Sequence, residues 1–99
     1  MTVDQEAKAL LLREEIVIRY PNGKIKEQYY EVNGEFDGEY KEWYKNGKLW
    51  IYCFYKDKGI DGDLKMWDED DKLIAHQIYK NGKFIKDLLE KIDDNRSRS

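Results

Sequence analysis

The sequence predicts a mainly β fold: a single twisted antiparallel meander of hairpins, built from 24-residue repeats and flanked by a short N-terminal helix and a C-terminal strand or helix. Three observations lead to this prediction. The dipeptide Asn-Gly, which favours tight hairpin turns, stands at 22–23, 33–34, 46–47 and 81–82. The stretches between these turns are rich in Tyr, Trp, Phe and Ile, which favour strands. The chain also repeats itself at a fixed spacing.

The repeat has a period of 24 residues and needs no gap between Glu15 and about Leu88. The segment Asn22-Gly-Lys-Ile aligns with Asn46-Gly-Lys-Leu and then with Asp70-Asp-Lys-Leu. Each repeat contains two turn signals, so we expect two strands per repeat. The expected strands cover residues 15–20, 24–32, 35–44, 48–56, 59–68, 72–80 and 83–90.

The turn at Asn46-Gly47 predicts how the strands around it pair. A two-residue type I′ loop at this point places Tyr44 opposite Leu49 and Trp43 opposite Trp50. It also places residues 40 and 42 opposite residues 53 and 51. A slip of one residue would move every side chain to the other face, so the register determines what each face presents.

The turn at Asn33-Gly34, treated in the same way, places Glu27 opposite Tyr40 and Tyr29 opposite Gly38. Both turns assign each residue of the shared strand to the same face. One face is then expected to be a core face: Ile16, Ile18, Tyr20, Ile25, Tyr29, Tyr40, Tyr44, Leu49, Ile51, Cys53, Leu64, Met66, Leu73 and Ala75. The second face mixes aromatic and charged residues: Arg19, Lys26, Gln28, Tyr30, Lys41, Trp43, Trp50, Tyr52, Phe54, Lys65, Trp67, Ile74, His76 and Ile78.

The segments that flank the repeats are expected to differ from them. Residues 1–14 form a predicted helical cap, whose leucines 10–12 pack on the core face near Tyr40, Leu49 and Ile51. The repeat domain covers residues 15–92, and its last part, 84–92, fits either a strand or a helix. Residues 93–99 are polar and are expected to form a flexible tail.

Composition narrows the class of protein. The net charge of −3 gives no general attraction to nucleic acid or to anionic membranes. No apolar run approaches the roughly 18 residues of a membrane span. The single cysteine, Cys53, excludes an intramolecular disulfide and suits a reducing compartment. We therefore expect a cytoplasmic protein, in a host cell or virion if the source is viral.

The sequence does not predict an enzyme. Serine occurs only in the last three residues, and the only threonine is Thr2. Cys53 and His76 are a possible thiol–imidazole pair, but strand alternation places them on opposite faces. The acidic run 68–71 lacks the spacing of a calcium-binding loop and occupies a turn position, which indicates a hairpin tip. We predict no catalytic residue, cofactor, metal or small-molecule substrate.

The segment Gly38-Glu-Tyr-Lys-Glu-Trp-Tyr-Lys-Asn-Gly-Lys-Leu49 and the segment Tyr79-Lys-Asn-Gly-Lys83 resemble the motifs of MORN-repeat proteins. The resemblance is to the variant repeat shared with the YwqK-like antitoxin family and with MORN-repeat proteins of large DNA viruses. It covers about residues 15–90. It implies a twisted antiparallel sheet without catalysis, and the tighter glycine pattern associated with lipid binding is absent.

The aromatic second face leads to the functional hypothesis. Its tryptophans either form a second minor core or bind a partner, since Trp, Tyr and Arg are enriched at binding hot spots. We expect a non-catalytic interaction or structural module that binds a protein partner or a second copy of itself. The alternatives are an antitoxin that neutralises a toxin and a module that binds phospholipid surfaces. The candidate partner-binding residues are Arg19, Trp43, Trp50, Tyr52, Trp67 and His76.

Overall fold

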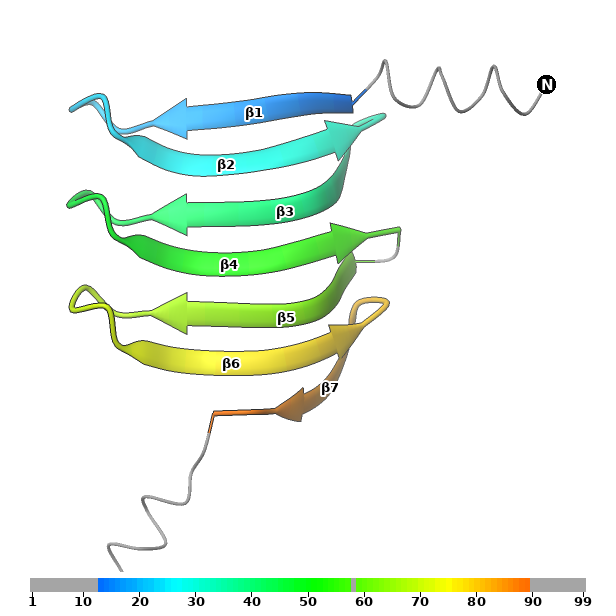
Figure 1. Cartoon of the computed structure of the whole chain (residues 1–99). Coiled ribbons are helices and arrows are strands. Elements are labelled where there is room, and N and C mark those ends of the chain that lie inside the picture. Colours follow the sequence, from blue (N-terminus) through cyan, green and yellow to red (C-terminus); the bar gives the residue numbers. More distant parts are fainter. Residues whose placement is uncertain (1–12, 58, 90–99) are drawn as a thin grey trace, which may run out of the picture.

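The computed structural model describes residues 13–57 and 59–89, and these form one seven-stranded antiparallel sheet with its strands in chain order (Figure 1). The predicted mainly β hairpin meander is confirmed. The strands are β1 (Arg13–Arg19), β2 (Ile25–Val32), β3 (Glu35–Trp43), β4 (Leu49–Lys56), β5 (Gly59–Trp67), β6 (Leu73–Lys80) and β7 (Lys83–Asp87).

The structure tests only part of what we predicted for the segments before and after the repeats. Residues 13 and 14, which we assigned to the N-terminal helix, instead begin strand β1, and residues 1–12 lie outside the described part. The alternative left open for residues 84–92 is decided as strand up to Asp87. Residues 90–99, and with them the predicted tail, also lie outside the described residues.

The 24-residue repeat is visible in the backbone hydrogen bonds of the turns on the left of Figure 1. In the β3–β4 turn, the amide of Tyr44 donates to the carbonyl of Lys48, and the amide of Gly47 donates to the carbonyl of Tyr44, both at 2.9 Å. The same pair of bonds closes the β1–β2 turn, from residues 20 to 24, and the β5–β6 turn, from residues 68 to 72. One local structure is therefore used three times.

These three turns are not the two-residue type I′ loops that the Asn-Gly pairs predict. Gly47 has a φ of 92°, but Asn46 is not among the described residues with positive φ. The β2–β3 turn does have positive φ at both positions, with 53° at Asn33 and 82° at Gly34, as type I′ requires. The Asn-Gly dipeptide is thus compatible with two turn geometries. The predicted type I′ turn is one of them, and it occurs in the β2–β3 turn but not in the β3–β4 turn.

The longer turn changes the pairing beside it. Trp43 pairs with Leu49 instead of Trp50, because a bulge lies between Glu42 and Trp43. The predicted pairs Tyr44–Leu49 and Trp43–Trp50 are therefore wrong, although the pairing of residues 40–42 with 51–53 is confirmed. The bulge recurs in the other two hairpins, where Ile25 pairs with Arg19 and Leu73 with Trp67. These three aliphatic residues, assigned to the core face, are instead paired with residues of the second face.

A second irregularity lies at Gly38 in strand β3. Tyr29 pairs with Tyr40 and not with Gly38, while Glu31 pairs with Phe36 nearer the turn. The register of the β2–β3 pair shifts by two residues between Tyr29 and Glu31, and Gly38 takes a φ of 101°. The predicted pairs Glu27–Tyr40 and Tyr29–Gly38 are therefore wrong. A shift of two preserves the faces, however, because side chains alternate with a period of two.

The middle of the core face follows the prediction. Successive pairings join Ile16, Tyr29, Tyr40, Cys53 and Leu64 across strands β1 to β5. Residues that oppose each other directly share a face, so these side chains form one row.

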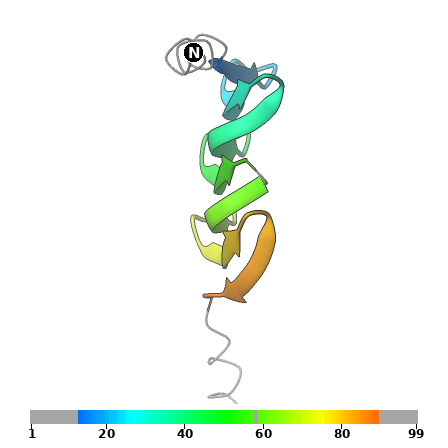
Figure 2. The same cartoon turned by 90° about the vertical axis from the view of Figure 1, so that its right-hand side faces the viewer.

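The described sheet is a single layer, as its edge-on view shows (Figure 2). Among residues 13–57 and 59–89, only Gly38 and Cys53 are buried. No helix of this part has the length and hydrophobicity needed to cross a membrane. Within residues 13–57 and 59–89, no second layer covers either face of the sheet.

Candidate interaction surfaces

A row of basic and aromatic side chains crosses the second face. Lys41, Tyr52, Lys65 and His76 are successive pairing partners on strands β3, β4, β5 and β6. All four residues are half-buried. Tyr52 and His76 thus lie in one row with Lys65 between them, and Lys41 lies on the other side of the tyrosine. We call these four residues the basic row.

Acidic side chains border the basic row. The Tyr52 hydroxyl donates to Oε2 of Glu39 at 3.4 Å, and Nε2 of His76 lies 2.9 Å from Oδ2 of Asp63. Burial and then the Glu39 carboxylate raise the pKa of Tyr52. Nζ of Lys41 is 3.6 Å from Oε1 of Glu39. Lys65 makes no ion pair within the described residues, so its charge remains uncompensated there.

The tryptophans Trp43 and Trp67 end strands β3 and β5, one repeat apart. Strand alternation places them on the face of Lys41 and Lys65. Both are half-buried. Trp43 also lines a shallow hollow together with Lys24, Ile25 and Gly47.

The remaining two candidate residues contact their own hairpins. The ring of Trp50 lies at the β3–β4 bulge and stacks on Tyr44, with a centroid distance of 5.3 Å and an interplanar angle of 26°. The Arg19 guanidinium donates through Nη1 to the carbonyl of Gly23 at 2.9 Å. No two tryptophan rings of the described residues are in contact. The six candidates therefore do not form one continuous cluster.

The opposite face carries an aromatic cluster that the sequence predicted only in part. Tyr29, Phe36, Tyr40 and Tyr55 lie with ring centroids 4.7–6.0 Å apart. Cys53 belongs to the same face and is only 2% exposed. Phe36 and Tyr55 were missing from the predicted core face, although strand alternation from Cys53 to Tyr55 would have indicated the latter. We call this side of the sheet the tyrosine face.

Two glutamates lie side by side on the tyrosine face. Glu27 pairs directly with Glu42 across strands β2 and β3. The Tyr40 hydroxyl donates to Oε1 of Glu42 at 3.0 Å and is 3.4 Å from Oε1 of Glu27. Burial, followed by the hydrogen bond to Glu42, raises the pKa of Tyr40 far above its usual range. Neither glutamate forms an ion pair with any described residue.

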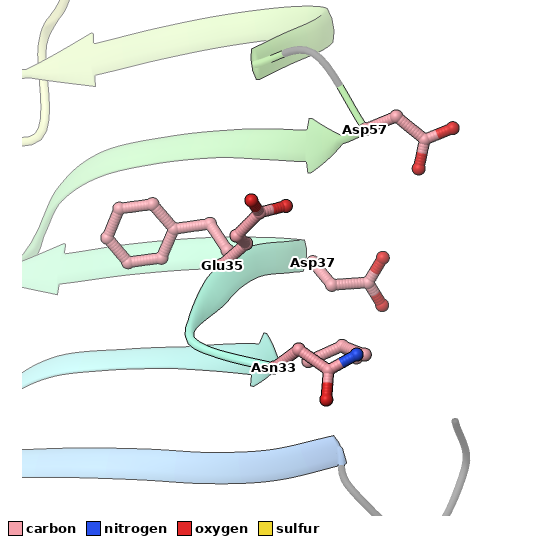
Figure 3. Close-up of a pocket in the computed structure, with 6 residues that line it drawn as sticks. Asn33, Glu35, Asp37 and Asp57 are labelled. Atoms are coloured by element: carbon pink, nitrogen blue, oxygen red, sulfur yellow. The ribbon is translucent and has the colours of Figure 1, made fainter. Parts of the chain in front are cut away.

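A hollow at the β2–β3 end of the sheet is lined by polar and acidic side chains (Figure 3). The figure shows the carboxylates of Asp37 and Asp57 directed away from the sheet, with Asn33 and Glu35 beside them. Within the described part of the chain, no group of three or more His, Cys, Asp or Glu residues has the geometry to hold a metal ion.

The acidic run 68–71 is a hairpin tip, as predicted. The Asp68 carboxylate accepts hydrogen bonds from the backbone amides of Asp70 and Lys72 at 2.8 and 3.0 Å. These two bonds, that of Lys72 first, lower the pKa of Asp68. The carboxylate therefore stabilises the turn. In the two earlier repeats the amides equivalent to that of Lys72 donate instead to the side chains of Asn22 and Asn46.

The predicted separation of the cysteine and the histidine is also confirmed. Cys53 pairs with Tyr40 and Leu64, whereas His76 pairs with Lys65, the next residue along β5 and hence on the other face. Burial raises the pKa of the Cys53 thiol to about 11, which keeps it protonated at neutral pH.

Comparison with protein families agrees with this architecture. Residues 36–57 and residues 60–81 each match the MORN repeat variant, and the two matches begin 24 residues apart, at 36 and 60. The first match covers most of β3 and all of β4, and the second covers most of β5 and all of β6. Neither a curated protein nor a solved structure matches the chain. MORN repeats generally serve as modules for interaction with proteins or membranes. Residues 36–57 and 60–81 of this chain are therefore two MORN repeats of the variant type.

Proposed function

We propose that this protein is a non-catalytic module that binds a protein partner through the second face of its sheet. The observation that carries the proposal is the single layer: nothing within the described residues covers the basic row or the tryptophans beside it. Trp and Tyr contribute strongly to protein interfaces when a partner excludes water from them.

The chemistry of the face indicates what the partner supplies. Lys65 lies between Tyr52 and His76 and has no ion-pair partner in the described residues. Trp67 follows two residues later on the same strand and therefore on the same face. A partner that presents a carboxylate beside an apolar side chain would pair with Lys65 and pack on Trp67.

Two narrower proposals follow from the same surface. An antitoxin would use the second face to bind a toxin, and the protein partner recovered with it would then be that toxin. A lipid-binding module would use the lysines of the basic row, but Glu39 and Asp63 border that row and repel anionic headgroups. We therefore favour a protein over a membrane surface.

Affinity purification from the cells that make the protein tests this proposal. Tagged wild type is compared with Lys65→Glu and Trp67→Ala, and recovered proteins are quantified by mass spectrometry. The matched control is Lys45→Glu, which makes the same charge change on an exposed turn residue. We expect one partner to be lost with both test variants and retained by the control. Purified partner should then bind Trp67→Ala more weakly by about 2 kcal/mol in calorimetry.

Two results would refute the proposal. One is equal recovery of every partner by the wild type and both test variants, provided that their circular dichroism spectra agree. The other is flotation of the wild type with anionic vesicles that Lys65→Glu abolishes, without any protein partner, since this result would identify a membrane module instead.

A further inference from the structure

Strand β1 forms one edge of the sheet, at the top of Figure 1, and β7 forms the opposite edge. β1 pairs with β2 on one side, and no strand of the described residues pairs with its other side. Tyr20, which follows β1, donates its amide to the carbonyl of Lys24 and so directs its backbone groups toward β2. Successive residues of a strand direct their amides and carbonyls to opposite sides, so Glu15, Val17 and Arg19 direct theirs to the open edge. This edge offers a row of groups that can bond another strand.

The two edges of the sheet differ in how regular they are. The register shift of the β1–β2 pair leaves Lys26 without a partner, so the extra residue belongs to β2 and β1 alternates regularly. In β7, by contrast, Ile85 has no partner, because the residues on either side of it pair with consecutive residues of β6. A bulge, together with lysines such as Lys83 and Lys86, hinders the pairing of an edge with another chain. β1 is therefore the more open edge.

The centre of β1 departs from the repeat in a way that favours pairing. Val17 precedes Lys41 of β3 by one repeat of 24 residues and Lys65 of β5 by two, so the three share one position of the repeat. Lysine on an edge strand protects it from pairing, yet here the edge strand has valine where the inner strands have lysine. Val17 is 39% exposed, and Ile18 beside it is 38% exposed. Apolar side chains thus occupy the centre of the edge.

Opposite charges flank this centre symmetrically. Glu15 and Arg19 each lie two residues from Val17, and strand alternation places all three on one face. Glu15 accepts a hydrogen bond from the side-chain amide of Gln28, and Arg19 donates to the carbonyl of Gly23. Neither charge forms an ion pair within the described residues. A strand with this arrangement is complementary in charge to an antiparallel copy of itself.

We propose that β1 pairs antiparallel with β1 of a second copy of the chain, about a two-fold axis at Val17. Val17 then opposes Val17 of the second copy, and Glu15 of each copy opposes Arg19 of the other. On the tyrosine face, Ile16 of each copy opposes Ile18 of the other. The two seven-stranded sheets become one continuous sheet. The pairing uses the edge and neither face, so this inference does not depend on the partner-binding proposal.

The alternative arrangements of the same edges are less favourable. β1 and β7 run in the same direction, so joining β1 to β7 of another copy with the faces aligned gives a parallel pair (Figure 1). For β1 with itself, an axis at Glu15 places this glutamate opposite its own copy. An axis at Ile16 places Arg13 opposite Arg19. Like charges directly opposite each other are destabilising, whereas the axis at Val17 pairs opposite charges on both sides.

Charge reversal and mixing test the proposed pairing. Sedimentation equilibrium of the wild type should give twice the chain mass of 12.0 kDa. Glu15→Arg and Arg19→Glu each place like charges opposite each other, so each should raise the Kd of the dimer about tenfold. An equimolar mixture of the two variants should restore the dimer, because an edge with two arginines then meets an edge with two glutamates. Glu69→Arg, the same charge change on an exposed turn residue, is the matched control and should leave the dimer intact.

A change at the axis gives a second readout. Val17→Lys introduces the residue that the inner strands carry at this position, so the fold should tolerate it and circular dichroism should be unchanged. The two ammonium groups would oppose each other at the axis, and the dimer should be lost. Val17→Thr keeps the branched shape without the charge and should retain the dimer.

Disulfide formation reports the register. In a Cys53→Ala background, Val17→Cys should link two chains in a glutathione buffer, because directly opposed residues have Cα atoms about 5.5 Å apart. Glu15→Cys should not link them, because its two copies would lie four positions apart, about 14 Å along the strands.

Several results would overturn the proposal. A wild type that is monomeric at every concentration shows that the edge does not pair with a second copy. A dimer that survives Val17→Lys but is lost with Ile85→Lys uses the β7 edge, and one lost only with Trp67→Ala uses the second face. A mixture of Glu15→Arg and Arg19→Glu that stays monomeric contradicts the proposed charge pairs. None of these results except the loss with Trp67→Ala bears on the second face, so the affinity-purification test stands apart from them.

Discussion

The hydroxyl of Tyr44 crosses strand β4 and donates a hydrogen bond to the carbonyl of Trp67, 2.7 Å away. One repeat earlier, Tyr20 makes the same bond to the carbonyl of Trp43, at 2.6 Å across β2. These bonds join alternate strands that share no ladder. They occur at the end of the sheet where the bulged turns lie, so they connect each repeat to the next.

Removing this hydroxyl should cost measurable stability. Tyr44→Phe retains the ring stacked on Trp50 but deletes the donor, so we expect the free energy of unfolding to fall by about 1 kcal/mol. Urea denaturation followed by tryptophan fluorescence measures the change. The control is Tyr52→Phe, whose hydroxyl makes only a long, exposed bond to Glu39. A loss with the control that equals the loss with Tyr44→Phe would contradict a connecting role.

The glycines of strand β5 permit a matched test of backbone geometry. Gly59 and Gly62 both have positive φ, 124° and 104°; Gly59 is the first residue of β5, and Gly62 lies inside the same strand. A Cβ at Gly59 would lie 3.0 Å from the Cα of Gly82, whereas a Cβ at Gly62 would meet no atom within 4 Å. We expect Gly62→Ala to cost about 1–2 kcal/mol through backbone strain alone. Gly59→Ala should cost more because backbone must also move.

Thermal unfolding of the two glycine variants decides this prediction. A lower melting temperature for Gly59→Ala than for Gly62→Ala is the expected order. The reverse order would mean that the close approach of Gly59 and Gly82 is relieved without cost.

The tryptophans of the second face should contribute little to folding. Trp43 is half-buried, so Trp43→Ala should lower the free energy of unfolding by less than the 3–5 kcal/mol of a fully buried tryptophan, at about 2 kcal/mol. Equilibrium denaturation measures it, and Tyr40→Ala in the aromatic cluster is the comparison. If Trp43→Ala unfolds the protein while Tyr40→Ala is tolerated, the second face is the core and not a binding surface.

Cys53 should make stability depend on pH in the alkaline range. Its folded pKa of about 11 lies above the value of an unfolded thiol. A raised pKa contributes stability that is fully present below the unfolded pKa and is lost as the pH rises toward the folded pKa. Between pH 7.5 and 9.5 we expect the wild type to lose about 1 kcal/mol more than Cys53→Ala. Denaturant titrations at both pH values measure the difference, and parallel losses in the two proteins would contradict the prediction.

The sequence alone determined the number and order of the strands and the side of the sheet taken by most central residues. The reason is local: each turn signal lies near its strands, and a period-two pattern leaves little freedom for residues such as Tyr40 and Cys53. The motifs of residues 38–49 also indicated the MORN repeat, and the matches to residues 36–57 and 60–81 agree with it.

Only the tertiary structure decided the exact pairing near the turns. Trp43 pairs with Leu49, and Tyr29 with Tyr40, because bulges at the turns and at Gly38 shift the register. A bulge is selected by the combined pairing of neighbouring strands, and Asn-Gly is compatible with both a tight turn and a bulged one. The sequence therefore grouped Trp50 and Arg19 with the other candidate residues, whereas the folded sheet holds both against their own hairpins.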